Sequence, residues 1–128
     1  SDEKDTALIL ASEKDRRKVV ALLLAANVDV NARRNNGMSA LLLAAQEGHQ
    51  QTIQALIKAK ADVNSQLENG ATPLMLAAQH GHLGAVHSLI AAPADLNLKA
   101  SNGMTALMLA NLYRYKEVID LLKKAGAK

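Results

Sequence analysis

Several side-chain types are absent or rare in this chain, and their absence narrows its chemistry. The 128 residues contain no Cys, Trp or Phe, only two Tyr and only two Pro. Without cysteine the chain has neither a disulfide framework nor a thiolate metal site, which fits a reducing, cytoplasmic compartment. The core must therefore be built from Leu, Ala, Ile, Val and Met, a set that favours thin, closely stacked helices.

Long apolar runs are also missing. No stretch reaches the roughly 18 apolar residues of a membrane helix, and the first ten residues, SDEKDTALIL, lack the basic start and apolar centre of a signal peptide. We therefore expect no membrane partner. Lys and Arg number 15 against 12 Asp and Glu, a net charge of +3, and the two signs are interspersed. Without a basic stripe and stacking aromatics, we expect no nucleic-acid partner.

What the chain does contain is a 33-residue register. Thr or Ser, Leu and Ala recur four times at this spacing, and Asp, Asn and Gly recur three times, as in Asp29, Asp62 and Asp95, Asn31, Asn64 and Asn97, and Gly37, Gly70 and Gly103. Such a period indicates supersecondary units that stack on one another, each too small to bury its own apolar face. The register therefore predicts a solenoid.

The third repeat shows how each unit is built. Asp62–Asn64 is expected to be extended, and Leu67–Gly70 to form a turn. Thr72 is a good N-cap for a first helix, and apolar residues at helical spacing predict a second helix over residues 83–91. Helices of this length are marginal alone in water, so packing between repeats must supply the stability.

These residues also carry a family resemblance. The segment 72–82, TPLMLAAQHGH, recurs in the same frame at 39–49, SALLLAAQEGH, and in part at 105–110, TALMLA. The chain resembles the ankyrin repeat family over its whole length. The resemblance implies an all-α solenoid of helix-turn-helix units with short β-hairpin or turn connections. It also implies a single domain, residues 1–128, with repeats at about 1–28, 29–61, 62–94 and 95–128.

The sequence departs from the family pattern in three places. The family's His after Thr-Pro-Leu is replaced by an apolar residue in every repeat, namely by Ile9, Leu42, Met75 and Met108, so apolar packing is expected there. After the second helix, Asn27 can mimic the family's glycine in the left-handed region and Lys60 can do so less easily, whereas Pro93 cannot. The charged segments at both ends predict polar outer faces that bound the stack.

The resemblance further implies a function, which is binding another protein through the hairpin tips and the concave face of the first helices. The expected contact residues are Arg33, Arg34, Asn35, Asn36, Met38, Gln46, Glu47, Leu67, Glu68, Asn69, Gln79, His80, Ser101, Asn102, Met104, Leu112 and Tyr113. Among them Arg33, Arg34 and Tyr113 are of the types that dominate binding energy. The identity of the partner is not encoded in any motif.

Catalysis and metal binding are not expected. His80, His82 and His87 lie close in sequence, but His49 and His82 occupy the position at which the family's ring bridges neighbouring loops, and His87 should face the convex side. No Cys and no Gly-x-Ser-x-Gly elbow is present. Ser39, Thr72 and Thr105 are expected to cap helices. We therefore predict a protein that is not an enzyme and has no metal or cofactor.

Two further hypotheses stay open beside the interaction module. One is an engineered or stability-optimised scaffold with no native partner. The other is self-association through the last repeat by Leu112, Tyr113 and Tyr115, so we expect a monomer and leave a dimer open. The asparagines Asn31, Asn64 and Asn97 resemble those hydroxylated in ankyrin domains of animal cells, although hydrogen bonding to turn backbone explains them as well.

Overall fold

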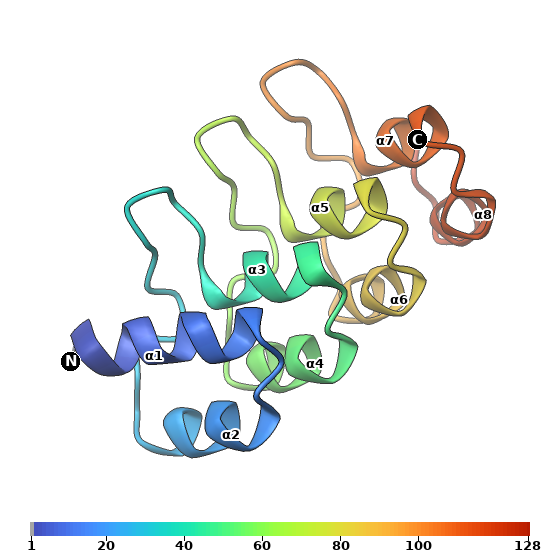
Figure 1. Ribbon diagram of the computed structural model, residues 1–128. Helices are drawn as coiled ribbons and strands as arrows, with labels where there is room; N and C mark the ends of the chain where they lie inside the picture. Colours follow the sequence, from blue (N-terminus) through green and yellow to red (C-terminus); the bar gives the residue numbers. More distant parts are fainter. Residues whose placement is uncertain (1) are drawn as a thin grey trace.

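The computed structural model describes residues 2–128, and in this part the chain forms eight α-helices arranged as four pairs (Figure 1). The helices are α1 Asp2–Glu13, α2 Arg17–Ala25, α3 Ala40–Glu47, α4 Gln50–Lys58, α5 Pro73–Gln79, α6 Leu83–Ala91, α7 Ala106–Leu112 and α8 Lys116–Lys124. The odd-numbered helices stack in one layer and the even-numbered helices in a second. The second helix predicted over 83–91 is confirmed.

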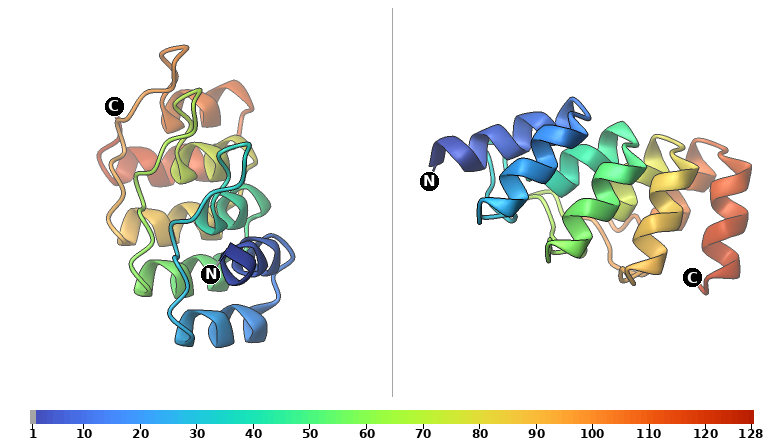
Figure 2. Two further views of the ribbon diagram at one scale, coloured as in Figure 1. Left: turned by 90° about the vertical axis from the view of Figure 1, so that its left-hand side faces the viewer. Right: turned by 90° about the horizontal axis from the view of Figure 1, so that it is seen from below.

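The loops between successive pairs project from the odd-numbered layer, away from the even-numbered one (Figures 1 and 2). Within the described residues these loops hold no strand, and the one isolated β-bridge joins Arg33 to Ser39. The expectation of an extended segment at Asp62–Asn64 is wrong, because Val63 and Asn64 form a turn. The turn at Leu67–Gly70 is confirmed by a bond of 2.8 Å from the Gly70 N–H to the Leu67 carbonyl.

Hydroxyl caps begin three of the four odd-numbered helices, as predicted. The side chains of Ser39, Thr72 and Thr105 each accept a hydrogen bond from the backbone N–H three residues later, at 3.1 to 3.2 Å. Each cap satisfies one of the N–H groups that a helix start leaves unpaired. Helix α1 differs, since it begins at Asp2 and continues through Thr6.

The core runs through the whole stack and is aliphatic. Leu42 and Met75, at the position where the family has His, are at most 1% exposed, and Ile9 is 3% exposed. All three side chains belong to the buried core, so the predicted apolar packing is confirmed. Met108, at the same position in the fourth helix pair, is 43% exposed.

The turns after the even-numbered helices follow the sequence expectation with one surprise. Asn27 has a φ of 61° as predicted, and Lys60 also adopts the left-handed region, with a φ of 76°. Pro93 does not, yet the Ala94 N–H still reaches the Leu89 carbonyl at 2.9 Å, as the Ala61 N–H reaches Leu56 at 3.0 Å. The closing hydrogen bond is therefore kept with a different backbone path.

A ladder of Asp and Asn side chains joins consecutive repeats. Asp62 Oδ1 accepts from the Asn64 N–H at 3.0 Å within its own turn, whereas Asn64 Oδ1 accepts from the Asp95 N–H of the next repeat at 2.7 Å. The bond within the turn recurs between Asp29 and Asn31 and between Asp95 and Asn97. The bond between repeats recurs at the same separation of 31 residues, from the Asp62 N–H to Asn31 Oδ1 and from the Lys128 N–H to Asn97 Oδ1. The expectation that Asn bonds turn backbone is confirmed, but the turn belongs to the following repeat. At the first junction Asp5 takes the part of Asn and accepts from the Asp29 N–H at 3.0 Å.

This ladder gives a first prediction. Asn64→Ala removes the acceptor of the Asp95 N–H and should lower the free energy of unfolding by about 1 kcal/mol, the usual net value of one hydrogen bond. Asn64→Asp keeps an acceptor, as Asp5 does, and should lose less than half as much. Chemical denaturation of both variants provides the measurement. Equal losses would show that the acceptor oxygen contributes nothing.

Candidate functional site

The hairpin tips are held to one another by side chains that recur at 33-residue spacing. Arg33 Nη1 donates to the Gln66 carbonyl of the next tip at 2.9 Å. Gln66 Nε2 in turn donates to the Gly70 carbonyl at 2.9 Å and to the Lys99 carbonyl at 3.4 Å. The three tips are therefore connected in series and present a preformed surface, which lowers the cost of ordering on binding.

The second and third tips also touch through their backbones. The Ser101 N–H donates to the Asn69 carbonyl at 2.8 Å. Gly70 faces this contact, because a Cβ built on it would lie 2.8 Å from the Ala100 Cα. The two tips thus form one joined edge of the surface.

Asparagine fixes the shape of each tip. The Oδ1 atoms of Asn36, Asn69 and Asn102 accept from the backbone N–H two residues later, at 3.0 to 3.1 Å. These three residues, predicted as contact residues, therefore use the side-chain oxygen to hold the turn and are themselves exposed. Asn35 is exposed in the first tip.

A shallow groove lies between the second and third tips and the helices below them. Its volume is about 200 Å³. Five of the expected contact residues line it, namely Asn69, Gln79, Ser101, Asn102 and Met104, together with Ala71, Met75, Ala100 and Leu109. The groove has an apolar floor and a polar edge, which is the usual composition of a protein-binding site.

The helix ends that face the same side are largely exposed. Glu47, at the end of α3, accepts from Gln46 Nε2 at 3.2 Å. His80 is exposed, and its Nδ1 lies 2.8 Å from the Leu76 carbonyl. Leu112 and Tyr113, at the end of α7, are 61% and 49% exposed. These positions remain accessible to a partner.

Two predicted contact residues are placed differently from expectation. Met38 is 8% exposed, so its expected place on the surface is wrong; its side chain packs into the core beneath the first tip. Arg34 is half-buried and paired with Glu13 at 3.1 Å, so its guanidinium joins the first two repeats. Of the remaining residues in the tips, Glu68 is exposed and Leu67 is partly buried against the core.

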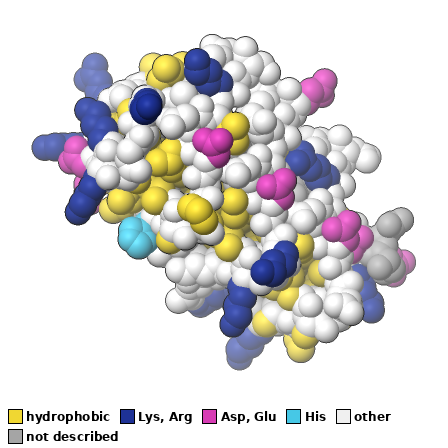
Figure 3. Space-filling model, turned by 180° about the vertical axis from the view of Figure 1, so that it is seen from behind, with side chains coloured by type: hydrophobic (Ala, Val, Ile, Leu, Met, Phe, Trp, Pro, Cys, Tyr) yellow, Lys and Arg dark blue, Asp and Glu magenta, His cyan; other side chains and the backbone are white. Residues whose placement is uncertain are grey.

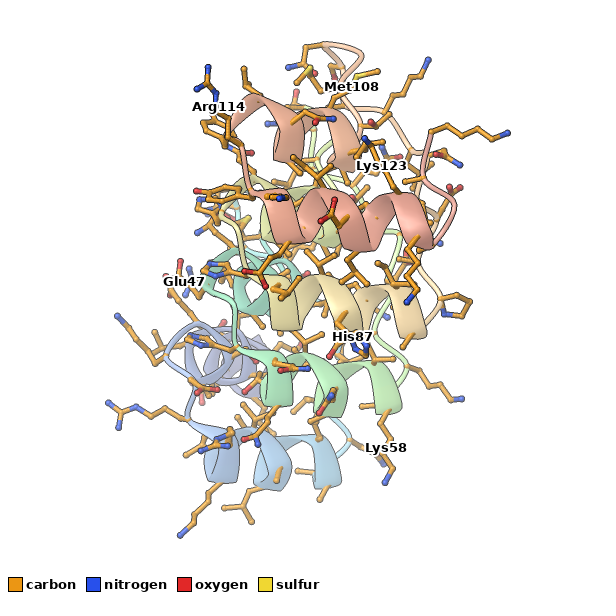
Figure 4. The ribbon with its side chains drawn as sticks, turned by 90° about the vertical axis from the view of Figure 1, so that its right-hand side faces the viewer. Glu47, Lys58, His87, Met108, Arg114 and Lys123 are labelled. Carbon is orange, nitrogen blue, oxygen red and sulfur yellow. The ribbon has the colours of Figure 1, made fainter. Side chains whose placement is uncertain are left out.

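The histidines have structural partners. His49 Nε2 lies 2.9 Å from the Glu13 carbonyl, and His82 Nε2 lies 2.9 Å from the Gln46 carbonyl. Each ring therefore bridges to the preceding repeat, where it meets the last turn of an odd-numbered helix instead of a loop. His87 is exposed on α6, on the face formed by the even-numbered helices (Figure 4). Among the residues that the structure describes, no three His, Cys, Asp or Glu side chains are grouped to hold a metal ion.

Comparison with protein families matches this arrangement. A family model described as ankyrin repeats, in three copies, matches residues 1–67 and 51–128. The chain belongs to the ankyrin repeat family. The all-α ankyrin solenoid expected from the sequence is thereby shown, and ankyrin repeats generally mediate protein–protein interaction. No curated protein matches the chain significantly.

Sequence reasoning located the ankyrin tips but missed the floor of the groove. Met75 and Leu109 line it from α5 and α7. Met75 was expected only to pack in the core, and Leu109 was not among the expected contact residues. The 33-residue register could have identified neither residue. It gives the place of a residue within its own repeat, whereas the groove depends on the distance between neighbouring tips. Over residues 2–128, no helix has the length and apolar character needed to cross a membrane.

Proposed function

We propose that the protein is a non-catalytic interaction module that binds a partner protein through its concave surface. This surface consists of the three tips and the exposed ends of the odd-numbered helices. The observation that carries the proposal is the groove between the second and third tips. There an apolar floor and hydrogen-bonding groups are presented by backbone that neighbouring repeats already hold in place.

The chemistry of the groove suits an extended or looped peptide segment. The amide of Gln79 and the hydroxyl of Ser101 line its edge and can donate and accept hydrogen bonds. Met104 can adapt its shape to an apolar side chain of the partner. Around the groove the exposed residues Arg33, Glu68 and Tyr113 supply charges of both signs and an aromatic ring.

Blocking the groove should abolish binding. Gln79→Arg combined with Ser101→Arg fills the groove without removing any hydrogen bond of the fold, and we expect partner capture to fall tenfold or more, about 1.4 kcal/mol. The measurement is quantitative affinity capture from a proteome by the immobilised chain and by the variant. A matched control, Gln51→Arg with Ala91→Arg, adds the same charge on exposed residues of α4 and α6.

The outcome separates this proposal from the other hypotheses. A protein captured by the unmodified chain and the control, but not by the groove variant, supports concave binding. A protein retained by the groove variant contradicts it. A scaffold without a native partner would capture no protein whose binding is lost in the groove variant or in the control variant. Self-association through Leu112, Tyr113 and Tyr115 would instead appear as dimers in light scattering.

A further inference from the structure

Each of the three tips ends its turn with the dipeptide Asn-Gly. The pairs are Asn36-Gly37, Asn69-Gly70 and Asn102-Gly103, and all three asparagines are exposed. In Figure 3 the tips form the upper right edge of the molecule, which is largely white because asparagine, glycine and backbone carry no charge. Asparagine cyclises most readily before glycine, since glycine has no Cβ to obstruct the attack of its own nitrogen. The tips therefore carry reactive side chains on the surface.

The reaction is an intramolecular condensation followed by hydrolysis. The backbone nitrogen of the glycine gives its proton to solvent and bonds to the Cγ of the asparagine. The Cγ–Nδ2 bond breaks, and the amide nitrogen takes a proton from water and leaves as ammonia. Water then opens the imide ring at Cγ, which gives aspartate, or at the main-chain carbonyl, which gives isoaspartate. Both products replace a neutral amide with a carboxylate.

Hydrogen bonds inside each tip restrain the reacting groups. In the first tip the Gly37 N–H donates to the Arg34 carbonyl at 2.9 Å, and Asn36 Oδ1 accepts from the Met38 N–H at 3.0 Å. The second tip has the same two bonds, at 2.8 and 3.0 Å. The glycine nitrogen must lose the first bond, and the asparagine side chain must leave the second, before a ring can form. Each tip therefore reacts only when it opens.

One backbone bond distinguishes the second tip from the first. The Asn69 carbonyl is part of the peptide unit whose nitrogen must attack, and it accepts from the Ser101 N–H of the third tip at 2.8 Å. The register equivalent would run from the Glu68 N–H to the Asn36 carbonyl, and among residues 2–128 this bond is not formed. The side-chain bonds from residues 33 and 66 to the next tip are common to both. The reacting peptide unit is therefore held by a neighbour in the second tip and not in the first.

Packing around the two glycines differs in the same direction. A Cβ built on Gly70 would lie 2.8 Å from the Ala100 Cα and 2.9 Å from the Ser101 nitrogen, which are backbone atoms. A Cβ built on Gly37 would meet the end of a flexible side chain, Leu67 Cδ2, at 3.2 Å. Both tips have a following tip beside them, so the contrast does not depend on where the stack ends. Opening of the second tip must move the third, whereas the first has only a side-chain bond to release.

We propose that Asn36 is a site of spontaneous conversion to aspartate and isoaspartate in the folded protein. The backbone bond between Asn69 and Ser101 protects the chemically identical pair in the second tip. The two pairs differ in how easily the tip around them opens, since each has the same reacting atoms. This reactivity belongs to the chain alone and does not require the partner of the concave surface.

Conversion at Asn36 changes the first tip in a way that depends on the product. Aspartate keeps an oxygen at the place where Asn36 Oδ1 accepts from the Met38 N–H. Isoaspartate adds a methylene group to the main chain just before Gly37 and so shifts Met38, which is 8% exposed and part of the core. Either product adds a negative charge to the tip that carries Arg33 and Arg34. The first tip therefore changes its charge in both cases and its shape in one.

Incubation of the folded chain at neutral pH, followed by peptide mapping, measures each site separately. Trypsin cleaves after Arg34, Lys60 and Lys99, so Asn36 and Asn69 lie in different peptides. Mass spectrometry detects the exchange of NH2 for OH, and chromatography separates aspartate from isoaspartate peptides. We expect conversion at Asn36 to be at least roughly tenfold faster than at Asn69, which corresponds to about 1.4 kcal/mol in the free energy of opening.

A matched pair of proline variants tests the protecting bond. Ser101→Pro removes the N–H that holds the Asn69 carbonyl, at the second residue of a β-turn, where proline is favoured. Conversion at Asn69 should then approach the rate at Asn36. Glu68→Pro makes the same change at the equivalent position of the second tip, where the N–H makes no bond to the first tip, and should leave Asn36 unchanged. Circular dichroism verifies that both variants are folded.

A parallel incubation in urea supplies the unfolded reference. Each rate in the folded chain is divided by the rate of the same site in urea, so that differences in local sequence cancel. Equal ratios at Asn36 and Asn69 would overturn the proposal. An Asn36 that stays intact in the folded chain for as long as its complete conversion takes in urea would also overturn it. The same holds for a folded Ser101→Pro variant in which Asn69 reacts as slowly as before.

Discussion

Replacing Leu42 with alanine is expected to lower the free energy of unfolding by about 3–5 kcal/mol. Leu42 is fully buried in α3, which packs on both α1 and α5. Truncation removes its transfer free energy and leaves a cavity at the centre of a stack in which each repeat depends on its neighbours. Urea denaturation followed by circular dichroism measures the loss.

Met108→Ala is the matched control for this prediction. Met108 stands at the same position of the last repeat and is 43% exposed, so the expected loss is about 1 kcal/mol or less. A large difference between the two variants would show that stability comes from stacking between repeats. Similar losses at both positions would contradict that view.

Gly70→Ala is expected to cost about 2–4 kcal/mol, because two penalties act at one residue. Gly70 has a φ of +83°, which an L side chain adopts only with strain. The added methyl group would also lie 2.8 Å from the Ala100 Cα and 2.9 Å from the Ser101 nitrogen. Because both neighbours are backbone atoms, the third tip must move, and the groove should lose its shape along with the Asn69–Ser101 bond.

Gly103→Ala separates the two penalties. Gly103 has nearly the same φ, +82°, but nothing lies within 4 Å of a Cβ built there. Only the backbone strain applies, about 1 kcal/mol. Thermal or chemical denaturation gives the loss in free energy of unfolding for each variant. The difference between the two losses measures the contact between the second and third tips. Equal losses would mean that the second and third tips do not touch in solution.

Much of the fold could be predicted from residues that repeat in phase. Thr72 and Ser39 indicate where helices begin, and the structure confirms both caps. The apolar residues at 42 and 75 indicated packing in place of the family's histidine, which burial confirms. Local chemistry at a fixed spacing was sufficient for these features because each depends on contacts that every repeat makes.

Features that depend on how neighbours are spaced could not be predicted. Arg33 looked like a contact residue, but the distance between tips lets its guanidinium bond the Gln66 carbonyl. Met38 looked exposed because it lies in a tip, yet the tip folds back over the core. The polarity of the N-terminal end was misjudged, because the charges of residues 13–18 lie at its edge, whereas Leu10 and Leu22 occupy the face itself.

The concave surface is tested most directly by amide hydrogen exchange of the chain with and without the protein that it captures. We expect slower exchange on binding at residues 67–71 and 100–104, the two tips that border the groove, and unchanged exchange in α4 and α6. Such a footprint would place the partner on the concave side. Protection confined to the even-numbered helices, with both tips unaffected, would contradict the proposed function.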